Sequence, residues 1–229
     1  MRAVHTEPPA ETGERNGLSY ALFLPADAPA GGVVVIHGAG SQKENHFDFA
    51  RACSAAGLAA VAFDQRGHGA SDGALDGRAI DDVATIAALL PDGAPVALRG
   101  SSMGGWLALA AGAALDAAAV VAICPASGAQ LRRGLDHRRF PFRADPTSLA
   151  PLLEATDLSA ASAALGERLL LMHAEGDEDV PVEHARALHA AAPASRLEVV
   201  PGGHHRSVQH DPDLQALSVR FIAARCGAR

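Results

Sequence analysis

Ser102 is the residue in this chain that is best placed to act as a nucleophile. It stands in the stretch GSSMG at 100–104, a G-x-S-x-G pattern. An apolar run at 96–98 precedes the pattern and a helix-forming run at 106–115 follows it, so the pattern falls where a predicted strand turns sharply into a predicted helix. Such a turn presents a serine hydroxyl above the edge of a sheet. The backbone N–H of Met103, at the start of the helix, can then face a developing oxyanion. The alternative interpretation is an ordinary glycine-rich turn between a strand and a helix.

A serine hydroxyl needs a base to be nucleophilic at neutral pH, and that base needs an acid to orient it. In a turn of this kind the acid and the base are expected later in the chain, each just after a strand. The predicted strand at 168–172 is followed by HAEGDEDVP at 173–181, and the predicted strand at 196–200 by PGGHHR at 201–206. Both positions therefore hold suitable residue types.

Short β-rich runs alternate with alanine-rich helical runs, a pattern typical of a parallel sheet flanked by helices. The sequence predicts strands at 18–24, 33–36, 59–63, 95–98, 118–123, 168–172 and 196–200. It predicts helices at 45–56, 80–90, 103–115, 182–192 and 211–225. The alternation stops between about 126 and 165. We expect this segment to form a small insertion of one or two short helices above the sheet.

Four stretches, in order, resemble the α/β-hydrolase superfamily. HGAG at 37–40 looks like the oxyanion loop after the third strand, and FDQRGHGASDG at 63–73 is similar to the D-x-R-G-x-G-x-S-x-G stretch. GSSMGG at 100–105 resembles the nucleophile elbow, and HAEGDEDVP at 173–181 resembles H-G-x-x-D-x-x-V-P. The resemblance covers nearly the whole chain. It implies an α/β fold with a mostly parallel central sheet of about eight strands, flanked by helices, with a short cap insertion.

The resemblance also implies roles for individual residues. Ser102 would be the nucleophile. Asp177 would be the acid, because it keeps the D-x-x-V-P spacing. Ala174 occupies the usual glycine position of the motif, however, and if Gly176 is the motif glycine instead, Asp179 is the alternate acid. His205, four residues after Pro201, would be the base, with His204 as the alternate. The backbone N–H groups of Ala39 and Met103 would form the oxyanion hole. We expect structural roles for His37, Asp64, Arg66 and His68.

Length and composition argue against several other classes of protein. The chain has 229 residues, which predicts one domain over 1–229. It has 26 acidic and 19 basic residues, a net charge of −7, which argues against a nucleic-acid partner. No apolar run is long enough to span a membrane, and Met1–Gly17 lacks the apolar core of a signal peptide. The three cysteines form no C-x-x-C pair, and no H-E-x-x-H motif is present. We therefore expect a cytoplasmic monomer or homodimer that uses no cofactor and no metal.

These features together predict a serine hydrolase that acts by acyl transfer, with a carboxylesterase for small to medium esters as the first choice. The segment at 126–165 is too short for the large lid of a lipase. A thioesterase or a small amidase or peptidase would use the same three residues and remains an alternative. A receptor or scaffold that has the fold without catalysis is the alternative from another class.

Overall fold

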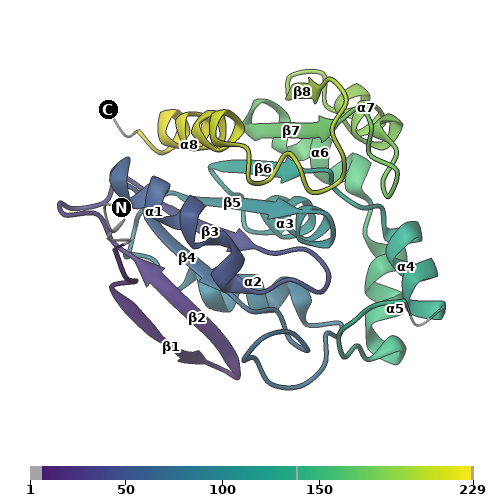
Figure 1. Cartoon of the computed structure of the whole chain (residues 1–229), viewed down its shortest axis with the longest axis horizontal. Helices are drawn as coiled ribbons and strands as arrows, with labels where there is room; N and C mark the ends of the chain where they lie inside the picture. Colours follow the sequence, from purple (N-terminus) through teal and green to yellow (C-terminus); the bar gives the residue numbers. More distant parts are fainter. Residues whose placement is uncertain (1–6, 138, 228–229) are drawn as a thin grey trace, which may run out of the picture.

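The structure, a computed structural model, describes residues 7–137 and 139–227. Its centre is a sheet of eight strands in the order β1-β2-β4-β3-β5-β6-β7-β8 (Figure 1). β1 and β2 pair antiparallel and β2 pairs antiparallel with β4, whereas all pairs from β4 to β8 are parallel. The strands are Glu11–Arg15, Leu18–Phe23, Gly32–Ile36, Ala59–Phe63, Val96–Ser101, Ala119–Ile123, Leu169–Ala174 and Arg196–Val200. The mostly parallel eight-stranded sheet confirms the predicted fold class.

The central strands are buried on both faces because helices cover each side. α1 (Phe47–Ala55) and α8 (Pro212–Cys226) cover one face. α2 (Ala79–Ala87), α3 (Met103–Ala114), α6 (Leu158–Leu165) and α7 (Val182–Ala191) cover the other. Successive strand residues alternate between these two cores, so that Val33 and Val35 pack under α1 and α8 while Val34 and Ile36 pack under the opposite layer. Two 3₁₀ turns, Lys43–His46 and Gly166–Arg168, complete the elements.

The segment at 126–165 forms three helices, α4 (Gly128–Asp136), α5 (Pro146–Ala155) and α6, of which α4 and α5 correspond to the one or two short helices expected above the sheet. α6 packs against α3 and α7 in the layer beside the sheet. α4 and α5 pack against each other at the end of the molecule toward which the parallel strands point (Figure 1). We call residues 126–155 the cap. Its helices begin with strong local signals: Ser127 and Gln130 form a capping box on α4, and Asp145 caps α5 before Pro146.

β1 was not predicted from the sequence. Its residues ETGER are largely exposed, and its only strand partner is β2 at the edge of the sheet. A strand with neither face buried carries no apolar alternation, so periodicity could not reveal it. None of the helices in the described part of the chain is long and apolar enough to cross a membrane.

Candidate active site

Ser102 lies at the point where β5 turns into α3, and its backbone is strained. Its φ and ψ are 54° and −117°, a left-handed conformation that a residue other than glycine rarely adopts. Its N–H donates to the carbonyl of Ile123 at 2.9 Å, which holds the turn against the neighbouring strand. The turn also requires glycines: a Cβ atom on Gly100 would lie 1.9 Å from the carbonyl oxygen of Gly104. The geometry is that of the sharp strand–helix turn predicted from the sequence.

The surroundings of Ser102 leave its hydroxyl available. Within the described residues, Ser102 Oγ has no hydrogen-bond partner, and neither the N–H of Met103 nor that of Ala39 donates to a protein acceptor. The loop after β3 passes close by, because a Cβ atom on Gly38 would lie 3.3 Å from the Cβ of Ser102. Two backbone donors near the serine are thus without a protein acceptor among the described residues, and an oxyanion hole requires such donors.

His37 shapes that loop. Its Nδ1 donates to the carbonyl of Gly38 at 2.8 Å, and its Nε2 accepts from the N–H of Gln65 at 3.0 Å. Burial lowers the pKa of His37 to about 4, so the ring stays neutral and keeps both bonds at physiological pH. This is the structural role expected for His37.

Asp177 follows β7 and lies directly beside His205. Its Oδ1 accepts from the N–H groups of Asp179 and Val180, both at 2.9 Å, and its Oδ2 lies 2.7 Å from His205 Nδ1. Burial acts to raise the pKa of Asp177, but the backbone N–H of Val180 and the His205 ring outweigh it and hold the pKa below its usual range. An ionised carboxylate can only accept, so His205 Nδ1 must carry the proton and Nε2 is left free as a base.

The two alternates are placed differently. Asp179 is exposed, and it is hydrogen-bonded to Asp177 through its backbone N–H and not through its carboxylate. His204 is exposed as well; its N–H donates to Ser207 Oγ, and its Nδ1 accepts from the N–H of Arg206 at 3.3 Å. The structure therefore brings Asp177 together with His205, whereas His204 stabilises the turn of its own loop.

Strand register brings these loops to one edge of the sheet. Ser101 pairs with Ile123, Ile123 with Met172, and Ala174 with Val200. The chains continue together past the strand ends, where the N–H of Gly176 donates to the carbonyl of Gly202 at 3.0 Å. We call the loops at 37–46, 64–73, 101–105, 174–181 and 201–211 the site edge. The arrows of β5, β6 and β7 point to this edge (Figure 1).

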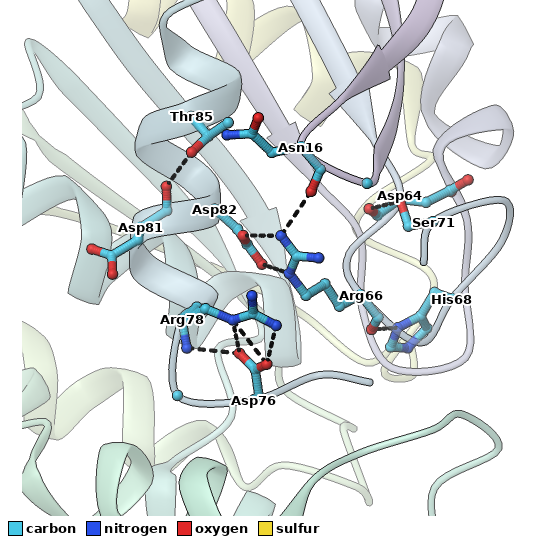
Figure 2. Close-up of polar contacts among 12 residues, drawn as sticks. Asn16, Asp64, Arg66, His68, Ser71, Asp76, Arg78, Asp81, Asp82 and Thr85 are labelled. Atoms are coloured by element: carbon cyan, nitrogen blue, oxygen red, sulfur yellow. Dashed lines mark hydrogen bonds and ion pairs between the residues drawn. The ribbon is translucent and has the colours of Figure 1, made fainter. Parts of the chain in front are cut away.

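Two separate buried ion pairs hold the loop at 64–73, which gives Asp64 and Arg66 structural roles. Asp64 accepts from Lys43 Nζ at 2.7 Å, from the Lys43 N–H at 2.8 Å and from the Ala70 N–H at 2.9 Å. Arg66 instead binds Asp82 of α2 through two bonds of 2.8 and 2.9 Å and donates to the carbonyl of Asn16 (Figure 2). The role of Lys43 was not predicted, although it is the only lysine in the chain.

Arg99 is a second residue that the sequence analysis did not single out. It lies in β5, is 1% exposed, stacks over the ring of Phe49 at 4.0 Å, and donates from Nη2 to the carbonyl of Gln209 at 2.8 Å. Burial lowers its pKa to about 10, which leaves it charged at neutral pH. Arg99 thus ties the loop that carries His205 to the strand that carries Ser102. A charged residue inside the apolar run VALRG was the available signal.

An apolar pocket lies between the site edge and the cap, next to Met103. Its walls come from α2, α3, the cap and the loop at 64–78. It encloses about 320 Å³ including its open mouth, but the side chains leave room for only about one water molecule within it. The lining residues are Gln65, Leu75, Ala79, Met103, Trp106, Leu107, Leu131, Phe140, Phe142, Leu149 and Leu153. His68, for which a structural role is expected, is 5% exposed, and its ring centroid lies 4.1 Å from that of Phe142.

Two groups of side chains in the described residues have atoms close enough together to ligate a metal ion. They are Cys124 with His173 and Asp177, and Asp177 with Asp179 and His205. Both groups contain Asp177, whose oxygens already accept from His205 and from two backbone N–H groups. A metal at either place would compete with these bonds, so the donor set fits a His–Asp pair better than a metal site.

Comparison with known proteins agrees with this fold. Residues 27–140, just under half of the chain, match the model of the family described as serine aminopeptidase, S33. A monoacylglycerol lipase from Paleococcus ferrophilus is 20% identical, with a TM-score of 0.73 over 91% of this chain and 99% of that one. Est1E from Butyrivibrio proteoclasticus, solved with ferulic acid, is 19% identical, with a TM-score of 0.68 over 96% of this chain and 99% of that one.

A thermostable carboxyl esterase from Bacillus coagulans is 14% identical, with a TM-score of 0.72 over 96% of this chain and 100% of that one. No curated protein sequence matches the chain. The sheet order and the structural neighbours show the α/β-hydrolase fold, and the match to the family model agrees with the resemblance seen in the motifs.

Proposed function

We propose that this protein is a serine hydrolase that cleaves carboxylic esters of small to medium size by acyl transfer. The observation that carries the proposal is the bond of 2.7 Å between Asp177 and His205 at the same sheet edge as the strained turn of Ser102. A nucleophile on a tight turn, a base with one free nitrogen and a buried acid are the three parts of a catalytic triad.

The chemistry follows from these positions. His205 Nε2 takes the proton of Ser102 as Oγ attacks the ester carbonyl, and Asp177 stabilises the imidazolium that forms. The N–H groups of Ala39 and Met103 hold the oxyanion of the tetrahedral intermediate. Collapse of the intermediate breaks the ester bond, and His205 returns the proton to the departing alcohol. Water, deprotonated by His205, then attacks the acyl-enzyme, releases the acid and restores Ser102.

The order of the strands in the sheet indicates how an ester would be oriented in the site. His205 follows β8, on the β6–β8 side of the elbow, whereas the pocket is built from segments that follow β4 and β5 and from the cap. The leaving group must lie next to the base that protonates it. We therefore assign the acyl group to the apolar pocket and the alcohol to the side of His205.

The names of the structural neighbours favour esters over amides or thioesters, although the matching family model is described as a serine aminopeptidase. The three structural neighbours described above are named as a lipase, an esterase and Est1E with a bound carboxylic acid. The apolar lining suits an acyl group, but the side chains leave room for only about one water molecule, so the cap must open before an acyl group can enter. The same triad would serve a thioesterase or an amidase, so matched ester, thioester and amide substrates of one acyl group rank the three activities.

Covalent labelling with a fluorophosphonate, followed by intact mass and peptide mapping, tests the proposal. We expect one adduct per chain, on Ser102. Ser102→Ala abolishes labelling and lowers ester turnover by about 10⁶-fold. Ser101→Ala is the matched control, because it removes the adjacent hydroxyl and keeps the elbow; it retains labelling. A folded protein that takes no label would overturn the proposal in favour of a receptor or scaffold.

A further inference from the structure

A further histidine, His173 of β7, lies beside Asp177 and takes no part in the proposed reaction. Its side chain is completely buried. Its Nε2 lies 2.8 Å from the carbonyl oxygen of Val180 and 3.4 Å from Asp177 Oδ2. Cys124 belongs to the same group: its sulfur, a ring nitrogen of His173 and an oxygen of Asp177 all lie within 4.8 Å of one another. The proposed acid therefore has a buried polar neighbour that the triad itself does not require.

The hydrogen bond to Val180 fixes which ring nitrogen of His173 carries the proton. A carbonyl oxygen can only accept, so Nε2 must donate. Nδ1 has no hydrogen-bond partner among the described residues, so a second proton there would be a buried donor without an acceptor. Burial lowers the pKa of His173, although the Val180 carbonyl and the Asp177 carboxylate act to raise it. The ring is therefore neutral at neutral pH, with its proton on Nε2.

Val180 connects this bond to the carboxylate of Asp177. The N–H of Val180 donates to Asp177 Oδ1 at 2.9 Å, and the carbonyl of the same residue accepts from His173. The other carboxylate oxygen, Oδ2, lies 2.7 Å from His205 Nδ1. The distance of 3.4 Å from His173 to Oδ2 is longer than an ordinary N–H···O bond. The main effect of His173 on Asp177 must therefore pass through Val180.

The acid loop, residues 174–181, has few other buried contacts. Within 175–180 only Asp177 and Val180 are buried, and the other four residues are exposed. The first half of the loop is joined to the end of β8, where the N–H of Glu175 donates to the carbonyl of Val200 at 2.8 Å. The second half depends on the packing of the Val180 side chain and on the bond from His173. Loss of that bond would let the part of the loop that holds Asp177 Oδ1 shift.

We propose that His173 is a positioning residue: its bond to the Val180 carbonyl holds Asp177 in the place from which it orients His205. The proposal rests on the triad function proposed above and adds a residue to it. His173 cannot replace His205 as the base, because its Nε2 is bonded to Val180 and its Nδ1 is buried. A displacement of about 1 Å at a reacting group can lower a rate by about 100-fold, so a single bond of this kind can matter.

His173→Leu tests the proposal, since it fills the space of the ring but removes the donor. With p-nitrophenyl acetate we expect kcat and kcat/KM to fall equally, by about 10- to 100-fold, because the lost bond orients a group that acts in the transition state. His173→Gln keeps an N–H donor near the place of Nε2 and should recover most of the loss. Parental kcat in His173→Leu would overturn the proposal, and so would a glutamine variant no better than the leucine variant.

Leu171→Ala is the matched control for stability. Leu171 lies two residues before His173, on the same face of β7, and it too is completely buried. The substitution should lower the melting temperature but leave kcat near the parental value, because it touches none of the hydrogen bonds of the acid loop. An equal fall of kcat in Leu171→Ala would show that the kinetics report the stability of β7, and would overturn the proposal.

Nuclear magnetic resonance of the parent protein with ¹⁵N-labelled histidine needs no variant. We expect a neutral His173 with its proton on Nε2, and a proton on Nδ1 instead would overturn the proposal. The proton between Asp177 and His205 should resonate far downfield, shift or broaden in His173→Leu, and stay unchanged in Leu171→Ala. If Ser102 takes no fluorophosphonate label, the proposed function fails. If Ser102 is labelled and His173→Leu turns over like the parent, only this inference fails.

Discussion

The site edge and the cap face each other across the pocket, and they are held in different ways. The site edge is fixed by strand register and by buried charges, with Asp64 and its partner Lys43 almost completely out of solvent. In the cap, Arg132 pairs with Asp136 and Glu154, but all three side chains are substantially exposed. What anchors the cap is apolar contact, through buried residues such as Leu131 and Leu153.

Because of this difference, the loops that carry the proposed reacting groups are held more rigidly than the cap, which shapes the pocket. The groups proposed to react lie on loops whose ends are hydrogen-bonded to adjacent strands, so small displacements there are resisted. Apolar contacts are non-directional, and cores tolerate substitutions that keep volume and pattern. We infer that the cap can change shape and selectivity without disturbing the triad.

The largest expected effect lies within the site edge, at its two adjacent histidines. His205→Ala should lower kcat/KM by about 10⁴–10⁶-fold, because it removes the base that Asp177 orients. His204→Ala is the matched control, with an expected change of less than about tenfold, since that ring only accepts a bond within its own loop. Steady-state kinetics on one ester checks both. A larger loss from His204→Ala would reverse the assignment.

The acid loop offers a second matched pair. Asp177→Asn should lower kcat by about 10⁴-fold, because an amide cannot hold His205 in the tautomer that leaves Nε2 free. Asp179→Asn keeps the backbone N–H that bonds Asp177 Oδ1, so its effect should be within a few-fold. Thermal melting of both variants controls for folding. Equal losses in the two variants would show that the carboxylates act together.

The sequence predicted the buried strands and the candidate reacting residues better than it predicted the contacts that hold the site edge and the cap. The apolar runs at 33–36, 59–63 and 118–123 lie within or overlap the observed strands, because strands buried on both faces leave an unmistakable pattern. Motifs and strand ends also indicated Ser102, Asp177 and His205 as the candidate reacting residues. Spacing alone could not choose between Asp177 and Asp179, because that choice depends on where each side chain points.

The remaining features depend on contacts between residues far apart in sequence. Lys43 and Asp64 are 21 positions apart, and Arg99 and Gln209 are 110 apart. No local pattern encodes such partners. In the cap, Pro151 lies inside α5, where a proline normally marks the end of a helix, so the local pattern does not give the bounds of this helix.

The next largest effect concerns the stability of the site edge. Lys43→Met leaves the Asp64 carboxylate buried without its cation, and we expect the free energy of unfolding to fall by about 3–5 kcal/mol. Urea denaturation measures the loss. The double variant Lys43→Met with Asp64→Asn should recover part of it, because no unpaired charge remains. A single variant as stable as the parent would show that the pair does not hold this edge.

The ion pair between Lys43 and Asp64 also predicts how the loss of stability in Lys43→Met depends on pH. Burial acts to raise the pKa of Asp64, but the Lys43 ammonium and the N–H groups of Ala70 and Lys43 outweigh it and hold the pKa below its ordinary value of 3.8. A depressed carboxyl pKa stabilises the fold above the ordinary value, and this contribution disappears as pH falls through the folded value. The difference between parent and Lys43→Met should therefore be full at pH 7 and shrink below about pH 4.

The smallest effect is expected in the cap, and it tests the comparison most directly. Glu154→Gln removes an ion pair with Arg132 that joins α5 to α4. Because both side chains are exposed, water and salt screen the pair, and we expect a loss of no more than about 1 kcal/mol. Added salt should abolish even that, whereas the loss in Lys43→Met should persist in salt. A loss of several kcal/mol from Glu154→Gln would mean that charge as well as apolar contact holds the cap. Its shape would then be as tightly determined as that of the site edge, and selectivity could not change independently of the triad.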